Sequence, residues 1–379
     1  MEYNLIESQP DLEKLESQWE ALELISDNQN LSSSFKWVYN WWNIFKDINN
    51  NTYGHNKSLA IITISTNGKI QLIAPLVKVY RKMGPFKVSF IEFIGQQWGA
   101  TSISFLKDRN FSITLKEIIA FLNKNISYDI FHIRQIPFDD EQEYSITLKP
   151  YSGCPYIKIA DYNTFDEYKD KIYSRKLKHY LRTSYNRMER DDIKTETSVD
   201  QITDENLKEI VRLSMSKIQD QKKCVYCKDE KLNFYTRIFK AFPSNIIFIK
   251  TINGVNLAYR INVFYQNIKT CIDTSFDRDY KMYNLGIITV DQNIHDSFEN
   301  PIIIHSMGPG MEDYKQKFCP DVQLIGRYIQ KGNTILSNVY NPLFCYITEW
   351  NDHKKEKLMD KKDFLTNVLI SMIHFILSD

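Results

Sequence analysis

Segment 276–315 decides the fold of this chain and reads FDRDYKMYNLGIITVDQNIHDSFENPIIIHSMGPGMEDYK. It predicts a strand end, a helix that opens at Asn284-Leu285-Gly286, a strand at 302–306, and a glycine-containing turn that ends at Lys315. A helix start carries backbone N–H groups without an intrahelical partner, and these attract anions. Together with the Lys315 ammonium they predict a cleft that holds an anion or an oxyanion. Such a cleft suits acyl transfer better than metal chemistry or hydride transfer.

Length, composition and net charge limit the class of protein. The chain has 379 residues, enough for two domains of about 150–200 residues each. Its 43% apolar and 25% charged residues are typical of a soluble globular protein. Because the net charge is only +1, no overall attraction to nucleic acid or to a membrane is expected.

Cysteine usage and the chain ends predict a cytoplasmic protein without a metal. The six cysteines are scattered, and the N-terminus lacks a signal-peptide pattern, which indicates reduced thiols in the cytoplasm. Cys224 and Cys227 form a single Cys-x-x-Cys, and a zinc site needs a second pair. No apolar run reaches the ~20 residues of a membrane span. We expect 364–377 to dock as a closing helix, with membrane-surface or partner contact as the alternative.

The order of the expected elements predicts an α/β fold with α+β mixed sheets. In the first half the patterns indicate helices at 11–24, 35–47 and 113–123, and strands at 58–65, 69–80, 88–94 and 130–136. In the second half they indicate helices at 164–191, 204–217, 234–241, 286–298 and 314–319, and strands at 156–160, 246–251, 255–265, 268–275, 302–306 and 322–329. The weak periodicity between them places domains at 1–150 and 151–335, with an extension at 336–379. The similar element order suggests tandem domains.

The aromatic helix 35–47 is expected to belong to the core. Trp37, Trp41 and Phe45 are four residues apart and share one face. A ring stripe at helical spacing is more often core than a platform that stacks a ligand.

Candidate catalytic residues gather after the last strands. Lys315 is placed to neutralise an oxyanion or a phosphate, and Tyr314 to protonate a leaving thiolate. His305 is either a core histidine or a base at the strand end. For the donor we select Asn284, Leu285, Gly286 and Gly308, although these glycines also fit ordinary turns.

The substrate-binding candidates are Arg175, Lys178 and Arg182, with Asp273 as an anchor for an acceptor amine. The helix segment 169–190 carries a local net charge of +6 from eight basic and two acidic residues. It is either a phosphate-binding face or an ordinary solvated face.

These motifs resemble a known family. Segments 174–182 (SRKLKHYLR) and 186–189 (NRME) resemble the basic helix of the CelD-like (cellulose biosynthesis protein-like) branch of GNAT acyltransferases, with Lys178 where that pattern has its first arginine. Gly286, and Gly310 through Tyr314-Lys315, resemble that branch's helix-opening glycine and Gly-x-x-x-Tyr-Lys signature. The likeness covers about residues 10–335. The acetyl-CoA loop of simple GNAT enzymes is reduced here to 284–286.

The resemblance implies tandem GNAT-like domains related to the Fem-type aminoacyl transferases. Family members transfer an acyl group to an amine from acyl-CoA, an acyl carrier protein or, in Fem-type relatives, aminoacyl-tRNA. The role of the Fem-type lysine, assistance to the reacting carbonyl or phosphate, carries over to Lys315.

Three functional hypotheses follow. The first is an N-acyltransferase that uses a thioester donor and a small-molecule or cell-envelope precursor amine. A carrier protein is its candidate partner, and envelope or polysaccharide metabolism is its candidate pathway. The second is a Fem-type transferase dependent on aminoacyl-tRNA, which the basic helix favours and the neutral overall charge disfavours. The third is a non-catalytic double-GNAT scaffold.

Overall fold

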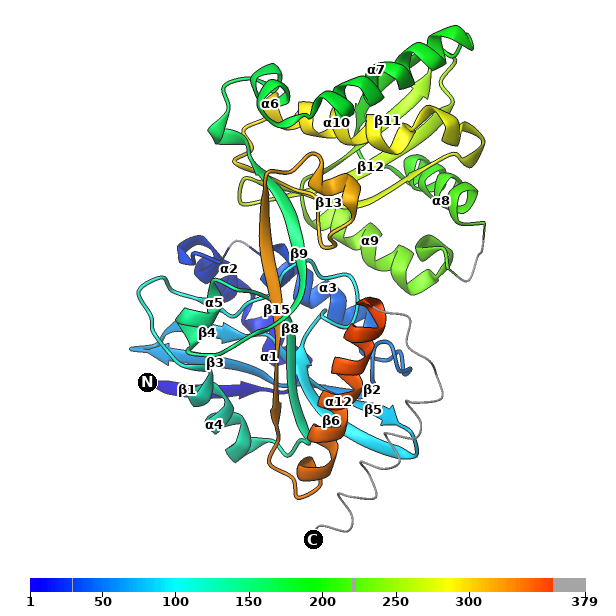
Figure 1. Cartoon of the computed structure of the whole chain (residues 1–379). Coiled ribbons are helices and arrows are strands. Elements are labelled where there is room, and N and C mark those ends of the chain that lie inside the picture. Colours follow the sequence, from blue (N-terminus) through cyan, green and yellow to red (C-terminus); the bar gives the residue numbers. More distant parts are fainter. Residues whose placement is uncertain (29, 220–222, 357–379) are drawn as a thin grey trace.

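The computed structural model describes residues 1–28, 30–219 and 223–356, and Figure 1 shows two halves stacked end to end. The N-terminal half contains strands β1 (Glu2–Ile6), β2 (His55–Leu59), β3 (Ile61–Thr66), β4 (Lys69–Ala74), β5 (Leu76–Met83), β6 (Phe86–Phe93), β7 (Leu106–Lys107) and β8 (Ile130–Pro137). Its helices are α1 (Gln9–Lys14), α2 (Glu16–Ile25), α3 (Phe35–Phe45), α4 (Leu115–Asn125) and α5 (Asp140–Tyr144), with the 3-10 turn η1 (Leu31–Ser33).

The C-terminal half contains strands β9 (Lys149–Lys158), β10 (Thr195–Asp200), β11 (Ser244–Thr251), β12 (Asn256–Tyr265), β13 (Ile268–Phe276) and β14 (Ile304–Ser306). Its helices are α6 (Phe165–Ile172), α7 (Arg175–Arg190), α8 (Asp204–Ile218), α9 (Asp229–Ala241), α10 (Leu285–Phe298) and α11 (Asp313–Gln316), with 3-10 turns η2 (Ile159–Asp161), η3 (Val225–Cys227) and η4 (Arg278–Tyr283). The chain then returns through β15 (Asp321–Lys331) to α12 (Ser337–Glu356) on the N-terminal half.

The strands form two mixed sheets. The smaller has the order β1-β3-β4-β7, and the larger has eleven strands in the order β10-β11-β12-β13-β14-β9-β15-β8-β6-β5-β2. Two expected strands each divide between the sheets. Segment 58–65 breaks at Ala60, and segment 69–80 breaks at Pro75, which has no N–H for a ladder. The carbonyl of Pro75 still accepts a hydrogen bond from Ile94 N–H at 2.9 Å, so the break stays tied to the next strand.

The expected long helix 164–191 is also two helices. The chain breaks at Tyr173 and Ser174, and α7 begins anew because the Ser174 hydroxyl accepts a hydrogen bond from Leu177 N–H. The residue pattern is helical both before and after Ser174. The sequence prediction therefore missed that this serine ends one helix region and caps the next. β1, β10 and α12 were not expected. The closing helix expected at 364–377 lies outside the described residues.

The two halves repeat one arrangement of strand, helix and parallel strand. In the N-terminal half β6 leads through α4 to β8, and β6 pairs with β8 in parallel. In the C-terminal half β13 leads through α10 to β14, with the same parallel pairing. The strands that follow are exchanged: β9 pairs with β14, and β15 pairs with β8. Because β9 and β15 also pair with each other, one sheet runs through both halves (Figure 1).

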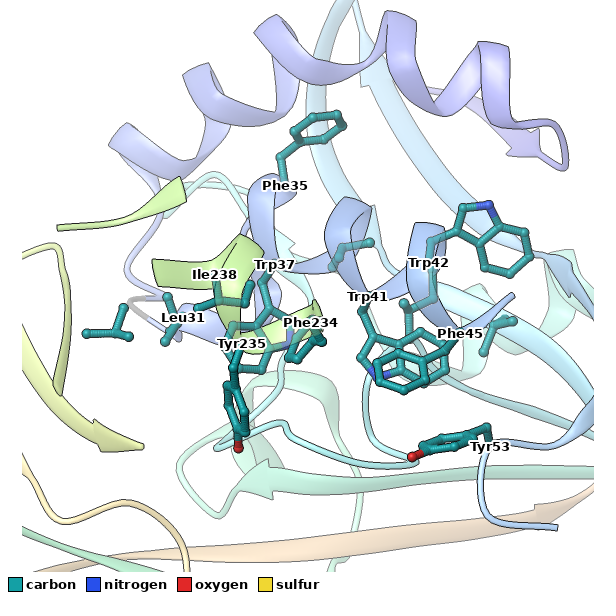
Figure 2. Packing of buried hydrophobic residues seen from close by; sticks show 14 of the residues in the cluster. Leu31, Phe35, Trp37, Trp41, Trp42, Phe45, Tyr53, Phe234, Tyr235 and Ile238 are labelled. Atoms are coloured by element: carbon teal, nitrogen blue, oxygen red, sulfur yellow. The ribbon is translucent and has the colours of Figure 1, made fainter. Parts of the chain in front are cut away.

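The tryptophan-rich helix joins the halves through its apolar face. Rings of α3 pack against α9 of the C-terminal half, with Trp37 edge-on to Phe234 at 5.0 Å and Phe45 at 5.6 Å from the same ring (Figure 2). Trp37, Trp41 and Phe45 are fully buried. The expectation that these rings are core is confirmed, and this core fixes the N-terminal half against the C-terminal half.

Candidate functional site

The candidate site lies where β14 parts from β13. Their pairing ends at Thr270 and Ser306, whereas β13 continues to Phe276, paired only with β12. Phe276 is about 20 Å beyond Thr270 at the usual strand rise. The predicted donor and catalytic segments line this stretch: the turn at Gly308 near its start, and Gly286 near its end.

Gly308 is required by close packing against β13. Its φ is +71°, and a Cβ there would lie 2.7 Å from the backbone oxygen of Cys271, so a larger residue would force the turn away. At the other end, a Cβ at Gly286 would lie 3.7 Å from the Phe276 ring, which is an ordinary contact. Gly286 is therefore replaceable by alanine as far as packing is concerned, whereas Gly308 is not.

The start of α10 is held by α7. Asn284 takes the left-handed conformation (φ +54°) before the helix; its side-chain oxygen accepts from Tyr180 Oη at 2.6 Å, and its Nδ2 donates to Ser184 Oγ at 2.8 Å. Leu285 is fully buried, so this turn can offer a ligand its backbone but not the leucine side chain. The predicted helix start is confirmed to within one residue.

Lys315 lies buried in its own turn. Its Nζ donates to the carbonyl of Pro309 at 2.7 Å and to that of Gly308 at 3.4 Å, and it lies 3.0 Å from a Glu312 carboxylate oxygen. An ammonium has three N–H groups, so these contacts occupy all of them. Lys315 therefore holds the turn that lies against β13, and the half-exposed Glu312 is the partner that can move away.

Tyr314 contacts a buried arginine. Its side chain hydrogen-bonds to Arg260, and burial raises the pKa of Tyr314. Arg260 lies on β12 and also donates to Cys271 Sγ at 3.3 Å, while its Nε has no hydrogen-bond partner among the described residues. Sequence reasoning missed Arg260, because an arginine within an apolar strand gives no signal before the sheet is assembled.

His305 is a core residue on the α10 face of the sheet. It is fully buried, and its Nδ1 lies 2.7 Å from Ser297 Oγ of α10. Burial lowers the pKa of His305 well below its usual value, with the nearby charges of Lys269 and Arg260 adding to the effect. The imidazole is therefore neutral at pH 7.

Asp273 faces the opposite side of the sheet. Its Oδ2 accepts hydrogen bonds from Tyr259 Oη at 2.6 Å and Tyr226 Oη at 2.9 Å, and burial raises its pKa. Tyr259 and Arg260 are neighbours on β12 and so point to opposite faces. Asp273 and Tyr314, which contact these two residues, are thus on different faces of the sheet.

The basic residues of α7 divide between two faces. Tyr180 and Ser184, one turn apart, contact the start of α10, and Arg187 on the same side donates to the carbonyl of Met282. Arg182 is two residues from Tyr180, so it lies on the other side of the helix together with Arg175 and Lys178. These three are exposed, and Lys178 pairs with Asp170 at 2.8 Å.

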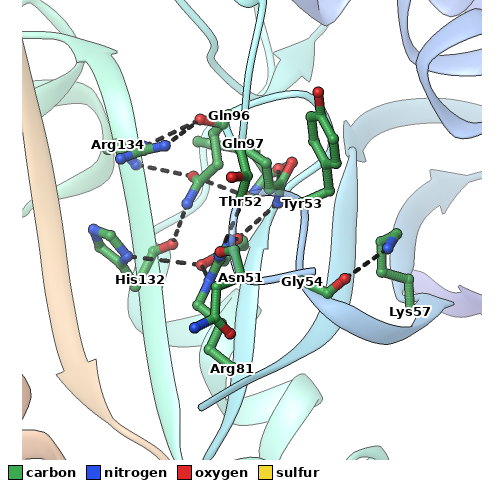
Figure 3. Close-up of polar contacts among 12 residues, drawn as sticks. Asn51, Thr52, Tyr53, Gly54, Lys57, Arg81, Gln96, Gln97, His132 and Arg134 are labelled. Carbon is green, nitrogen blue, oxygen red and sulfur yellow. Dashed lines mark hydrogen bonds and ion pairs between the residues drawn. The ribbon is translucent and has the colours of Figure 1, made fainter. Parts of the chain in front are cut away.

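In the N-terminal half, β6 and β8 separate in the same way, but a side chain lies between them. Their parallel pairing ends at Ile91 and Phe131. Beyond it the side-chain amide of Gln96 bridges both strands: its oxygen accepts from the backbone N–H of Phe93 at 3.2 Å and of Arg134 at 3.1 Å, and its nitrogen donates to the carbonyl of His132 at 3.0 Å (Figure 3).

A buried ion pair lies next to this bridge. Burial alone would raise the pKa of Glu92, but the two-point contact with Arg81, at 2.8 and 3.0 Å, lowers it to about 2. Gln97 donates to the same carboxylate at 2.7 Å. Within the described residues no side chain bridges the backbones of β13 and β14 in this way, so the two halves differ at the corresponding place.

The described residues contain neither a candidate metal site nor a helix that could span a membrane. Among these residues there is no group of three or more His, Cys, Asp and Glu side chains suited to a metal ion. No helix within the same residues has both the length and the apolar character needed to cross a bilayer.

Comparison with protein-family models gave no match, and comparison with curated proteins gave none. Among solved structures, FemX matches with a TM-score of 0.60 and 12% identity, over 89% of this chain and 99% of that chain. L-PGS from Bacillus licheniformis matches with a TM-score of 0.49 and 15% identity, over 86% of this chain and 95% of that chain. A tandem GNAT protein from the clavulanic acid biosynthesis pathway matches with a TM-score of 0.47 and 9% identity, over 87% and 98%.

At 12% identity the FemX match shows the fold, over nearly the full length of both chains. The predicted fold class is confirmed: the chain has mixed α/β sheets and shares its fold with FemX. The relation to the CelD-like branch stays a prediction.

Proposed function

We propose that this protein is an N-acyltransferase that moves an acyl group from a thioester donor to an amine. The observation that carries the proposal is the parting of β13 and β14 beside the start of α10, within a fold shared with FemX. An extended thioester arm has amide groups that can pair with the free edge of β13, as a neighbouring strand would. Phosphates of the donor would lie against the first N–H groups of α10.

Lys315, Tyr314, Gly308 and the segment 284–286 are the residues we assign to the donor side. Once Glu312 turns outward, the freed N–H of Lys315 can donate to the oxyanion that forms on the reacting carbonyl. Tyr314 is our candidate to give its proton to the leaving thiolate. Arg187, which lies beside the α10 start, replaces Arg182 as the best-placed cation for a donor phosphate.

The N-terminal half is not expected to hold a second donor. Gln96 occupies the hydrogen-bonding groups that a donor arm would need between β6 and β8. We accordingly assign the donor to 151–335, treat 1–150 as the other GNAT-like domain, and place the protein in the cytoplasm and in the CelD-like branch.

A second candidate donor is aminoacyl-tRNA. The match to FemX and the exposed face formed by Arg175, Lys178 and Arg182 favour it. Binding of RNA through phosphates releases counterions, so affinity would fall steeply with salt.

The test compares two arginines of one helix. Thermal shift and calorimetry with CoA, acyl-CoA and charged tRNA are run on the wild-type chain, Arg187→Ala and Arg182→Ala. A thioester donor at α10 predicts that CoA stabilises the protein and that Arg187→Ala, but not Arg182→Ala, weakens CoA binding. Salt-sensitive tRNA binding that Arg182→Ala reduces would instead establish the second candidate. No stabilisation by any donor would leave the non-catalytic scaffold.

A further inference from the structure

A cavity of about 620 Å³ lies between the two halves, and none of residues 284–286 lines it. One wall comes from N-terminal loops and from α5, including Ser104, Asp139 and Asp140. The other wall comes from strands β9, β13, β14 and β15. A volume of this size admits a small polar molecule and is within the usual range for ligand sites.

The cavity comes close to the proposed donor residues at a defined point. Thr270 and Ser306 line it, and they are the last paired residues of β13 and β14. The next residue of β13, Cys271, touches the Gly308 turn that Lys315 holds. A ligand in the cavity therefore borders the place where the donor carbonyl is expected.

The charges in the cavity are unbalanced. Four carboxyl groups line it but only two lysines, and one of these, Lys107, is already paired with Glu143 at 2.8 Å. The carboxylate of Asp140 accepts a hydrogen bond from the hydroxyl of Ser104. No cationic side chain of the described residues forms an ion pair with Asp140, although the residue is partly buried.

The electrostatics of Asp140 follow from this position. Burial raises its pKa to about 6, with Asp139 adding to the rise, and with Ser104 and Lys107 opposing it. Burial raises the pKa of Tyr144, on the same helix, and the charge of Asp140 adds to that rise. A partly buried carboxylate without a counter-ion is destabilising, and a ligand cation placed against it reduces that cost.

We propose that this cavity binds the acceptor as a primary ammonium ion on a small polar body, and that the carboxylate of Asp140 recognises the charge. The inference rests on the proposed acyl transfer to an amine and adds its substrate class and its place. Asp140 is a recognition residue here, and the reacting carbonyl belongs to the donor, beside Lys315 and Tyr314.

Calorimetry on the full-length chain tests the inference with ethanolamine, putrescine and glucosamine as probes, and with ethylene glycol and glucose as neutral counterparts. The amines should bind and the neutral molecules should not. Asp140→Asn should weaken amine binding at least tenfold, since the asparagine oxygen still accepts from Ser104 but carries no charge. Asp166→Asn is the matched control, because Asp166 lies outside the cavity and its side chain is exposed, so that water screens its charge.

A proton measurement separates charge recognition from a structural role. Cation binding lowers the pKa of Asp140, so near pH 6 amine binding should release protons, seen as a heat that depends on the buffer. Asp140→Asn should abolish this release. Equal affinity for amines and neutral counterparts, or unchanged amine affinity in Asp140→Asn, overturns the inference. If CoA esters bind while amines do not, the inference fails and the proposed donor site stands. If amines bind while no donor binds, the amine site stands and the proposed donor site fails.

Discussion

The ammonium of Lys315 lies 3.0 Å from the carboxylate of Glu312, three residues earlier on the same turn. The contact closes the set of partners around Lys315, because the other two N–H groups already donate to the carbonyls of Gly308 and Pro309. Lys315 is buried whereas the side chain of Glu312 is 56% exposed. The pair thus has one fixed member and one that can leave.

Lys315→Ala should lower turnover by roughly 10²–10³-fold if the lysine stabilises an oxyanion. The same change removes the bonds that hold the Gly308 turn, so the melting temperature is measured beside turnover with the donor and acceptor found by screening. Near-normal turnover would exclude the assigned role, whatever happens to stability.

Glu312→Gln serves as the counterpart. Water screens the half-exposed Glu312 carboxylate, and the Lys315 ammonium keeps its two carbonyl partners, so the free energy of unfolding should change by about 0–1 kcal/mol. Turnover should equal or exceed that of the wild type, because the glutamine competes less strongly for the lysine. A tenfold loss of turnover would show that the carboxylate takes part in the reaction.

Gly286→Ala distinguishes packing from ligand approach. The added Cβ meets only the Phe276 ring at 3.7 Å, and alanine is the better helix former by about 1 kcal/mol. The variant should therefore melt at a slightly higher temperature. If donor phosphates approach this backbone, the same variant should bind CoA more weakly; unchanged CoA affinity would place the phosphates elsewhere.

Asp140→Asn should change how stability depends on pH. A carboxyl group whose folded pKa is raised to about 6 stabilises the folded state only while protonated, and this contribution is lost as the pH rises from about 4 to about 6. Above pH 7 the asparagine variant should thus be more stable than the wild type, by about 1–3 kcal/mol, and near pH 4 the two should be similar. Urea unfolding at pH 4 and pH 8 measures both, and a constant difference would contradict the assignment.

Gln96→Ala should cost about 2–4 kcal/mol of unfolding free energy, because the backbone groups of Phe93, His132 and Arg134 lose their buried partner. The exposed Gln201→Ala is the matched control and should change stability by less than about 0.5 kcal/mol. Equal effects of the two substitutions would show that the bridge does not stabilise the N-terminal half.

The sequence by itself determined the elements whose causes are local. The α10 start at Asn284 and the apolar face of Trp37, Trp41 and Phe45 follow from backbone preference and helical spacing. The order of strands and helices was sufficient to predict mixed α/β sheets, because the spacing of apolar residues within each segment indicates whether it is a helix or a strand.

Only the tertiary structure decided which strands pair and which side chains meet. The exchange of β9 and β15 between the halves joins residues far apart in the chain. The alternation of apolar and polar residues in a strand predicts the strand but not the strand with which it pairs. For the same reason Arg260 beside Tyr314, Gln96 between β6 and β8, and Asp140 in the cavity between the halves gave no signal in the sequence. Their environments depend on burial and on neighbours that long-range packing brings together.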